Sequence, residues 1–163
     1  DAGGLTWAAP STGLALNDAV TTDTKEQTST STTYADVLNG SSVTLELGPV
    51  TPVSSSNRLY LTGYMNATNT AGDATQHRFY IQPMGDIGGA GYANLYTEVF
   101  HGQYGCNSGN QDSRRIQFHF IWSPNTTSAC KVKFQYKWAY ASTSGSVVVK
   151  ATCNLRLLEI GPA

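Results

Sequence analysis

Residues 116–140 read IQFHFIWSPNTTSACKVKFQYKWAY, and this stretch decides the fold class. Apolar side chains occupy every second position on both sides of a polar centre: Ile116, Phe118, Phe120 and Trp122 before it, and Val132, Phe134, Tyr136, Trp138 and Tyr140 after it. A period of two is typical of strands with one buried face and one solvent face. The centre, Ser123–Ser128, combines Pro with Asn, Ser and Thr, which favour turns. The stretch therefore predicts a pair of strands joined by a turn, and the solvent face of the second strand carries Lys131, Lys133, Gln135 and Lys137.

Similar strand-like runs recur along the rest of the chain, separated by turn residues. They predict strands over Thr28–Leu38, Val43–Leu47, Arg58–Met65, Gln76–Met84, Asn94–Tyr104 and Ser146–Ile160. We expect Gly48-Pro49 to end the second of these, Asn66–Ala74 to be a polar loop and Gly85–Gly91 to be a mobile loop. Gly63, inside a strand, indicates a bulge or close packing. On the last strand, Val147, Val149, Ala151, Cys153, Leu155 and Leu157 share one face.

About eight strands without an amphipathic helix predict an all-β protein, an antiparallel β-sandwich with a jelly-roll-like order. Residues 1–27 lack any persistent period, so we expect an extended arm or connector there and the β-sandwich domain over residues 28–163. On the last strand, Val147–Val149 and Leu157–Leu158 are apolar on both faces. A second copy of the chain would cover such a strand, which indicates an oligomer.

Bulk properties exclude several classes of function. The chain has 163 residues, a net charge of −1 and 13% charged residues, with no basic run suited to nucleic acid. It has no apolar run near the ~20 residues of a membrane helix, so we expect no membrane partner. It shows no secretory signal peptide, and because it begins at Asp1 without Met we expect a processed or excised piece of a longer protein.

The sequence gives no pattern for a metal, a cofactor or catalysis. His77, His101 and His119 lack the spacing of metal ligands. The glycines of Gly85–Gly91 have neither the preceding parallel strand nor the following helix of a phosphate-binding loop. Glu98 and Asp112 are not brought together by any motif, and no GxSxG is present. We therefore expect no enzymatic activity.

Three cysteines, Cys106, Cys130 and Cys153, leave two alternatives open. The first is three reduced thiols, with Cys residues acting as small side chains on strands. The second is a Cys130–Cys153 bridge between paired strands, which leaves one thiol free.

The candidate ligand-binding residues lie between two glycine-rich loops. They are Tyr92, Asn94, Tyr96, His101, Gln103 and Tyr104. Flat rings beside amides suit a sugar, because its CH groups stack on the ring and its hydroxyls meet polar side chains. The alternative is that Tyr92, Tyr96, Phe100 and Tyr104, spaced by four, line a core or a subunit seam.

The order of short motifs resembles the C-terminal β-sandwich domain of bacteriophage tail-fibre proteins. The residues that carry the resemblance are Thr33–Val37, Ser42–Leu45, Ser55–Leu59, Ser123–Ala129, Lys133–Lys137 and Leu157–Ile160. The resemblance covers roughly residues 28–160. The cysteines and the Tyr-rich middle depart from the family pattern.

This resemblance implies a virion protein at the distal end of a fibre. It implies a homotrimer that binds the host surface, often a glycan, and we expect the N-terminal arm to contact other virion proteins. Two alternatives stay open: a structural capsid-fibre, decoration or tail-assembly protein without a receptor role, and a secreted carbohydrate-binding module.

Overall fold

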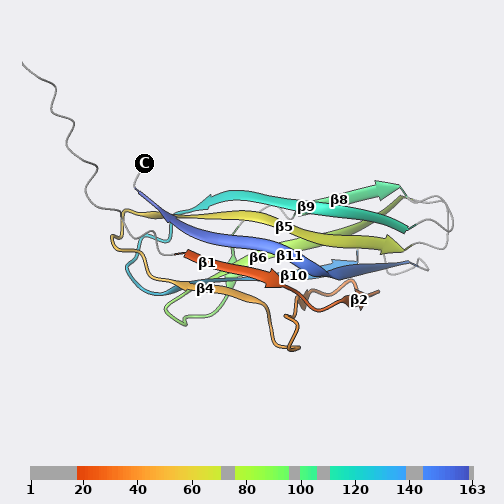
Figure 1. Cartoon of the computed structure of the whole chain (residues 1–163), viewed down its shortest axis with the longest axis horizontal. Coiled ribbons are helices and arrows are strands. Elements are labelled where there is room, and N and C mark those ends of the chain that lie inside the picture. Colours follow the sequence, from red (N-terminus) through yellow and green to blue (C-terminus); the bar gives the residue numbers. More distant parts are fainter. Residues whose placement is uncertain (1–17, 71–75, 96–99, 106–110, 139–144, 162–163) are drawn as a thin grey trace, which may run out of the picture.

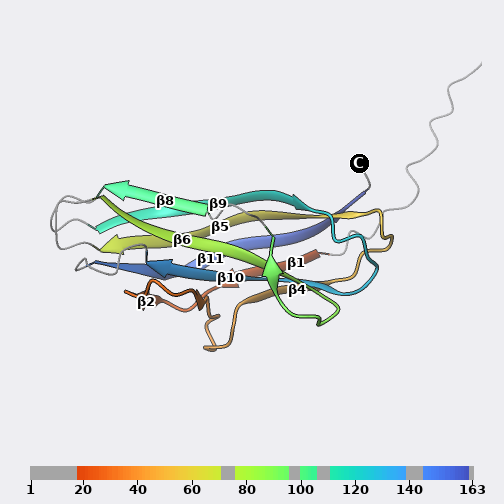
Figure 2. The same ribbon diagram turned by 180° about the vertical axis from the view of Figure 1, so that it is seen from behind.

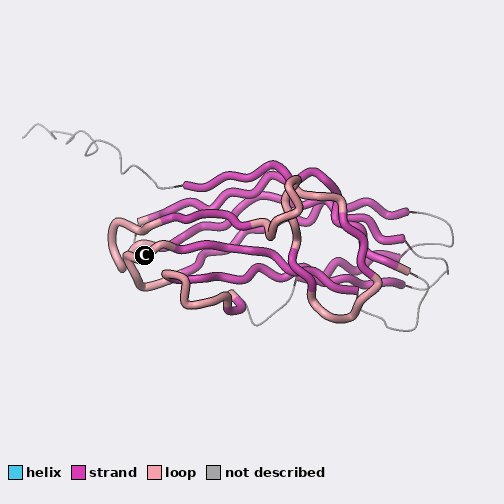
Figure 3. Tube along the Cα trace, turned by 90° about the horizontal axis from the view of Figure 1, so that it is seen from below, coloured by secondary structure: helices cyan, strands magenta, loops and turns pink. Residues whose placement is uncertain are grey.

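The computed structural model describes residues 18–70, 76–95, 100–105, 111–138 and 145–161. All regular structure in these residues is β, and no helix occurs among them (Figures 1 and 3). The strands are β1 Asp18–Asp23, β2 Gln27–Ser29, β3 Ala35–Asp36, β4 Glu46–Val50, β5 Arg58–Thr70, β6 Gln76–Ile87, β7 Ala93–Asn94, β8 Phe100–Gly105, β9 Gln111–Trp122, β10 Cys130–Trp138 and β11 Ser146–Ile160.

These strands form two antiparallel sheets packed face to face. The five-stranded sheet has the order β1-β11-β5-β9, with β2 also paired to β11. The six-stranded sheet has the order β3-β10-β6-β7, with β4 also paired to β10 and β8 to β6. Successive long strands change sheet, from β5 to β6, from β8 to β9, from β9 to β10 and from β10 to β11 (Figures 1 and 2). This is the predicted β-sandwich, and the alternation is typical of a jelly-roll-like order.

The core lies between the sheets and is built from the predicted alternating positions. Phe118 of β9 and Phe134 of β10 meet across it, with ring centroids 5.2 Å apart and planes tilted by 59°. The largest fully buried side chains are Trp138, Phe79, Phe118, Phe134, Leu45, Leu47, Leu59, Leu61, Met65, Ile81, Leu155 and Leu157. Each such side chain contributes about 1.5–3 kcal/mol on burial, so this interior fixes the positions of both outer faces.

The opening stretch folds differently from the predicted pair of strands. Both strands form, but β9 pairs with β5 and β10 pairs with β6, so they lie in opposite sheets. The connection from Ser123 to Ala129 crosses between the sheets, which lie roughly 10 Å apart in a sandwich. An alternating pattern predicts which face of a strand is buried. A hairpin within one sheet and two strands in opposite sheets bury the same faces, so the pattern does not distinguish them.

Two further strand predictions also need correction. Thr28–Leu38 is not one strand, because β2 belongs to the five-stranded sheet and β3 to the six-stranded sheet. β4 runs through Gly48-Pro49, a cis peptide, to Val50 instead of ending there. Proline is tolerated at this position because β4 is an edge strand.

The predicted loops after β5 and β6 begin later than expected. β5 continues to Thr70, and β6 continues through Gly85 to Ile87, so the turn begins at Gly88. Gly63 has φ +128°, and a Cβ there would lie 2.9 Å from the Leu155 Cα and closer still to the Asn154 carbonyl oxygen. The register around Gly63 is regular, so close packing, and not a bulge, is the reason for this glycine.

Two expectations about the last strand, β11, need correction. Ala151 is exposed, because a register shift between Val149 and Cys153 breaks the alternation. The apolar runs Val147–Val149 and Leu157–Leu158 predict a covering second chain, but Val148 is only 8% exposed and Leu158 is half-buried within a single chain. The valines therefore give no reason for an oligomer, and the homotrimer rests on the family resemblance alone.

β1 lies within the stretch predicted as an arm, and its residues pair with β11, so the five-stranded sheet includes Asp18–Asp23. Residues 1–17 lie outside the described part. Cys130 and Cys153 are buried and are not bonded to each other, and their strands β10 and β11 belong to different sheets, so the alternative of a bridge between paired strands is wrong. Cys106 lies outside the described residues.

Candidate ligand-binding face

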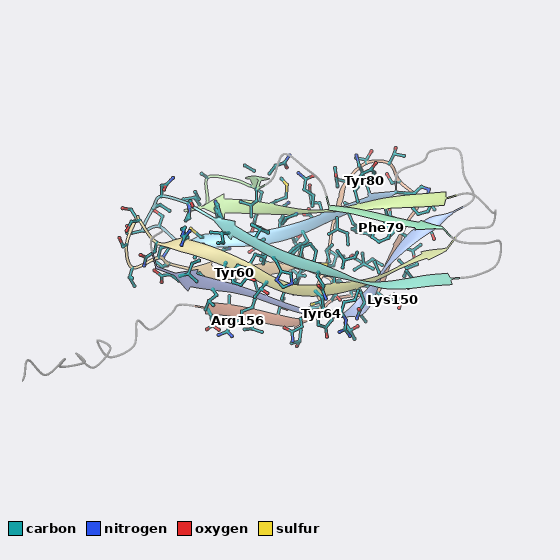
Figure 4. The ribbon with its side chains drawn as sticks, turned by 90° about the horizontal axis from the view of Figure 1, so that it is seen from above. Tyr60, Tyr64, Phe79, Tyr80, Lys150 and Arg156 are labelled. Atoms are coloured by element: carbon teal, nitrogen blue, oxygen red, sulfur yellow. The ribbon has the colours of Figure 1, made fainter. Side chains whose placement is uncertain are left out.

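The outer face of the six-stranded sheet gathers polar and aromatic side chains, and it is turned toward the viewer in Figure 2. Its centre is β10, in which buried and partly exposed residues alternate along the whole strand. The partly exposed positions are the four predicted ones, Lys131, Lys133, Gln135 and Lys137. On the neighbouring β6, Phe79 lies between the layers and Tyr80 lies on the outside (Figure 4).

One end of this face is a network around Glu46. The Tyr92 hydroxyl donates a hydrogen bond of 2.6 Å to Glu46 Oε1, and Lys131 Nζ lies 2.9 Å from Glu46 Oε2. The bonds from Tyr92 and Lys131 lower the pKa of Glu46. Burial, the bond to Glu46 and the nearby negative charges raise the pKa of Tyr92. Lys133 Nζ lies 4.7 Å from the centroid of the Tyr92 ring, which holds this ring over β10.

The middle of the face is organised by Asp36 of β3. Lys133 Nζ lies 2.9 Å from Asp36 Oδ1, and Gln135 Nε2 donates to the same oxygen at 2.8 Å. Thr44 donates to Asp36 Oδ2 at 3.3 Å. Burial acts to raise the pKa of Asp36, but the bonds from Gln135, Lys133 and Thr44 and the Lys133 charge outweigh it and lower that pKa.

The other end of the face holds a lysine between two tyrosines. Lys137 Nζ lies 4.4 Å from the ring centroid of Tyr34 and 5.1 Å from that of Tyr80. Lys137 and Tyr80 are directly opposite in the ladder between β10 and β6. The Tyr34 hydroxyl is buried and has no hydrogen-bond partner among the described residues. Burial, followed by the neighbouring Tyr80, raises the pKa of Tyr34.

The predicted ligand-binding residues fall at different places. Tyr92 belongs to the Glu46 network, and Asn94 is exposed on β7 opposite Met84. His101, Gln103 and Tyr104 are residues of β8, opposite Tyr80, Arg78 and His77 of β6 respectively. Tyr96 lies outside the described residues. The ladder therefore brings His101 beside Tyr80, whereas Tyr92 and Asn94 lie toward the other end of β6.

Asn94 also lines a small hollow at the edge of the sandwich. Its volume is about 250 Å³, and its walls are Gly85, Ile87, Ala90, Gly91, Ala93, Asn94, Leu95 and Trp122. Because Gly85 has no side chain, Leu95 and Trp122 can lie close to the backbone of β6 and make the hollow narrow. A Cβ at this position would clash with Leu95 and would lie 3.0 Å from Trp122 Cζ2. The walls are mainly apolar, so the hollow suits an apolar group better than a charged one.

Sequence reasoning missed Tyr34, Tyr80, Glu46 and Asp36 as members of the face. The alternating lysines of β10 are the sequence feature that indicates them, since a solvent face rich in positive charge needs acidic or aromatic partners on neighbouring strands. Which strands supply those partners depends on the sheet order, which the pattern does not contain.

The opposite outer face, on the five-stranded sheet, is also polar (Figure 4). His119 is exposed, and its Nδ1 lies 3.1 Å from the Tyr60 hydroxyl and 3.2 Å from the Thr62 hydroxyl. The Arg115 guanidinium lies 4.2 Å from the centroid of the Tyr64 ring. These contacts join β5 and β9 and have no acidic member.

The described residues contain no group of three His, Cys, Asp or Glu side chains able to hold a metal ion. In the same part of the chain, no helix has the length and apolar character needed to cross a membrane. What the outer face of the six-stranded sheet offers is a set of hydrogen-bonding groups, aromatic rings and lysine charges, which is suited to binding a polar ligand.

Comparison with known proteins shows the fold. No family model matches this sequence, and no curated protein matches it significantly. A structure of the Gt strain of infectious bursal disease virus is similar over 88% of this chain and 33% of that chain, at 10% identity and a TM-score of 0.52. The VP2 subviral particle of that virus is similar over 88% of this chain and 33% of its own, at 9% identity and a TM-score of 0.51.

T=1 particles derived from infectious bursal virus give a third match, over 97% of this chain and 35% of that chain, at 10% identity and a TM-score of 0.50. This chain thus spans about a third of the length of the chains that it matches. At such low identity the likeness establishes a shared β-sandwich architecture.

Proposed function

We propose that this chain is a β-sandwich domain of a virus-particle protein, and that it binds a host-surface glycan through the outer face of the six-stranded sheet. The observation that carries the first half is the likeness over 88% of the chain to structures from infectious bursal disease virus. The motif order of phage tail-fibre domains supports the same location. The proposal includes self-association, as a homotrimer, and contact with other virion proteins through the N-terminal residues, and it includes no enzymatic activity.

The location on particles has a direct test. Antibodies raised against the isolated domain should label purified particles in electron microscopy, at fibres or at the particle surface. Light scattering of the isolated domain should give three times the mass of the 17.4 kDa chain. A domain absent from particles would refute the proposed location, and a monomer would refute the trimer.

The attachment role is supported by the composition of the outer face of the six-stranded sheet. Rings and amides at Tyr34, Tyr80, Tyr92 and Gln135 are the groups that recognise sugars. Soluble domain added in excess should block adsorption of particles to host cells. A control variant, Arg115→Gln on the opposite outer face, should block equally well, because its guanidinium lies over Tyr64 on the five-stranded sheet.

A purely structural role is the second candidate, and the same likeness to virus particles favours it. The two candidates differ in the adsorption assay. A domain that labels particles but does not compete for host cells would be structural only.

A further inference from the structure

Lys137 differs from the other lysines on the outer face of the six-stranded sheet. Lys131 is paired with Glu46 at 2.9 Å, and Lys133 is paired with Asp36 at 2.9 Å. Among the described residues, no carboxylate forms an ion pair with Lys137. Aromatic rings attract an ammonium group but carry no net charge. Lys137 is therefore a positive charge without a counter-charge among the described residues, and it lies at the Tyr34 and Tyr80 end of the face.

Strand pairing holds the groups around Lys137 in place. Lys137 and Tyr80 are opposite one another in the ladder, and Tyr34 directly precedes the Ala35–Asp36 strand on the other side of β10. The three side chains thus come from neighbouring strands, with the ammonium 4.4 Å and 5.1 Å from the two ring centroids. The Tyr34 hydroxyl is an unused hydrogen-bond donor among the described residues. Because this hydroxyl is buried, Tyr34 contributes its ring to the surroundings of Lys137.

We propose that Lys137, Tyr34 and Tyr80 bind the anionic group of an acidic saccharide. The lysine provides a charge-assisted hydrogen bond to a carboxylate or sulfate, and the Tyr34 ring beside it helps to hold the ammonium in place. The tyrosine rings offer apolar surface for the CH groups of the sugar that carries this anion. A nucleic acid fits poorly, because it needs a row of cations and the neighbouring lysines are already paired. The inference deepens the proposed function, on which it rests for the choice of a glycan.

The test uses the whole chain and paired oligosaccharides in titration calorimetry. One pair is a glucuronic-acid oligosaccharide and its carboxyl-reduced form; the other is a sulfated oligosaccharide and its desulfated form. The acidic member should bind at least tenfold more tightly than its neutral partner, and its affinity should fall with added NaCl. The stronger of the two acidic probes identifies carboxylate or sulfate as the preferred group.

Two lysine variants distinguish binding at a specific site from nonspecific attraction of an acidic ligand to positive charges on this face. Lys137→Met and Lys131→Met remove the same charge from the same strand and the same face. Lys137→Met should weaken acidic-probe binding about tenfold or more, the loss expected for one charge-assisted hydrogen bond. Lys131→Met should change it less than twofold. Tyr34→Phe, which keeps the ring and removes only the buried hydroxyl, should change it less than twofold, and Lys137→Arg should retain most of it.

Several results would overturn the inference. They are equal binding of acidic and neutral members, equal losses in Lys137→Met and Lys131→Met, binding of inorganic sulfate as tight as that of the sulfated oligosaccharide, or no binding of any probe. Thermal unfolding of each variant shows that it is folded. If the chain binds neutral and acidic oligosaccharides equally well, the inference about Lys137 is wrong but the proposed glycan attachment is not. If the domain does not compete with particles for adsorption to host cells, the attachment itself is refuted.

Discussion

Replacing Gly63 by alanine should destabilise the five-stranded sheet at its centre. Gly63 lies in β5 between Phe118 of β9 and Leu155 of β11. A methyl group there would lie 2.9 Å from the Leu155 Cα and closer to the Asn154 carbonyl oxygen, and both are backbone atoms that no side-chain rotation can move away. The strands would have to separate locally, and such overpacking costs about 1–3 kcal/mol.

The backbone conformation adds a second cost. Gly63 has φ +128°, where an L side chain is strained, and this costs about 1–3 kcal/mol. The expected loss in the free energy of unfolding is therefore about 2–6 kcal/mol, a large part of the roughly 5–15 kcal/mol of a typical domain.

Gly91→Ala is the matched control. Gly91 also has a positive φ, +104°, but a Cβ there would have no neighbour within 4 Å. Its cost should be about 1–3 kcal/mol, from conformation alone. Urea unfolding followed by tryptophan fluorescence measures both variants. If Gly63→Ala loses no more than Gly91→Ala, the close approach of β5 and β11 is not what requires this glycine.

Three further predictions concern buried and paired groups. The pKa of Asp36 is lowered in the folded state, so its contribution is present above pH ~4 and is lost as the pH falls through the folded pKa; Asp36→Asn should flatten the pH dependence of stability below pH ~4. Glu159 is 1% exposed and accepts a 2.6 Å bond from Asn57 Nδ2, so Glu159→Ala should cost about 2–4 kcal/mol in urea unfolding, against less than about 0.5 kcal/mol for the exposed Glu26→Ala. Burial and then the Asp86 charge raise the pKa of Cys130 to about 11, so iodoacetamide at pH 8 should modify Cys130 at least tenfold more slowly in native than in unfolded protein, as read by mass spectrometry. Equal rates would contradict this.

Much of the fold could be predicted from alternation alone. The buried positions of β10, from Cys130 to Trp138, follow a strict period of two because one side of the strand faces the core. The same holds for Ile116, Phe118 and Phe120 of β9. Alternation fails at Ala151, where the register shift turns the residue outward. Such a shift has no local signature in the sequence.

Sheet membership could not be predicted in the same way. The strands before and after Ser123–Ala129 look like the arms of a hairpin, yet they belong to different sheets. The burial of each strand is the same in both arrangements, so only the long-range ladders to β5 and β6 decide between them. The polar partners of Lys131 and Lys133 depend on this choice, because Glu46 and Asp36 reach them only after β4 and β3 pair with β10.

The same ladders explain why this face can be a preorganised site. Tyr34, Tyr80 and Lys137 are far apart in sequence, but β3, β10 and β6 are hydrogen-bonded neighbours. Directly beneath this row, Trp138 and Phe79 are opposite one another in the ladder and fully buried. Well-packed side chains keep single rotamers, so the spacing of the ammonium and the rings is set by the core. A ligand that binds there meets groups already in place, and little conformational entropy is lost on binding.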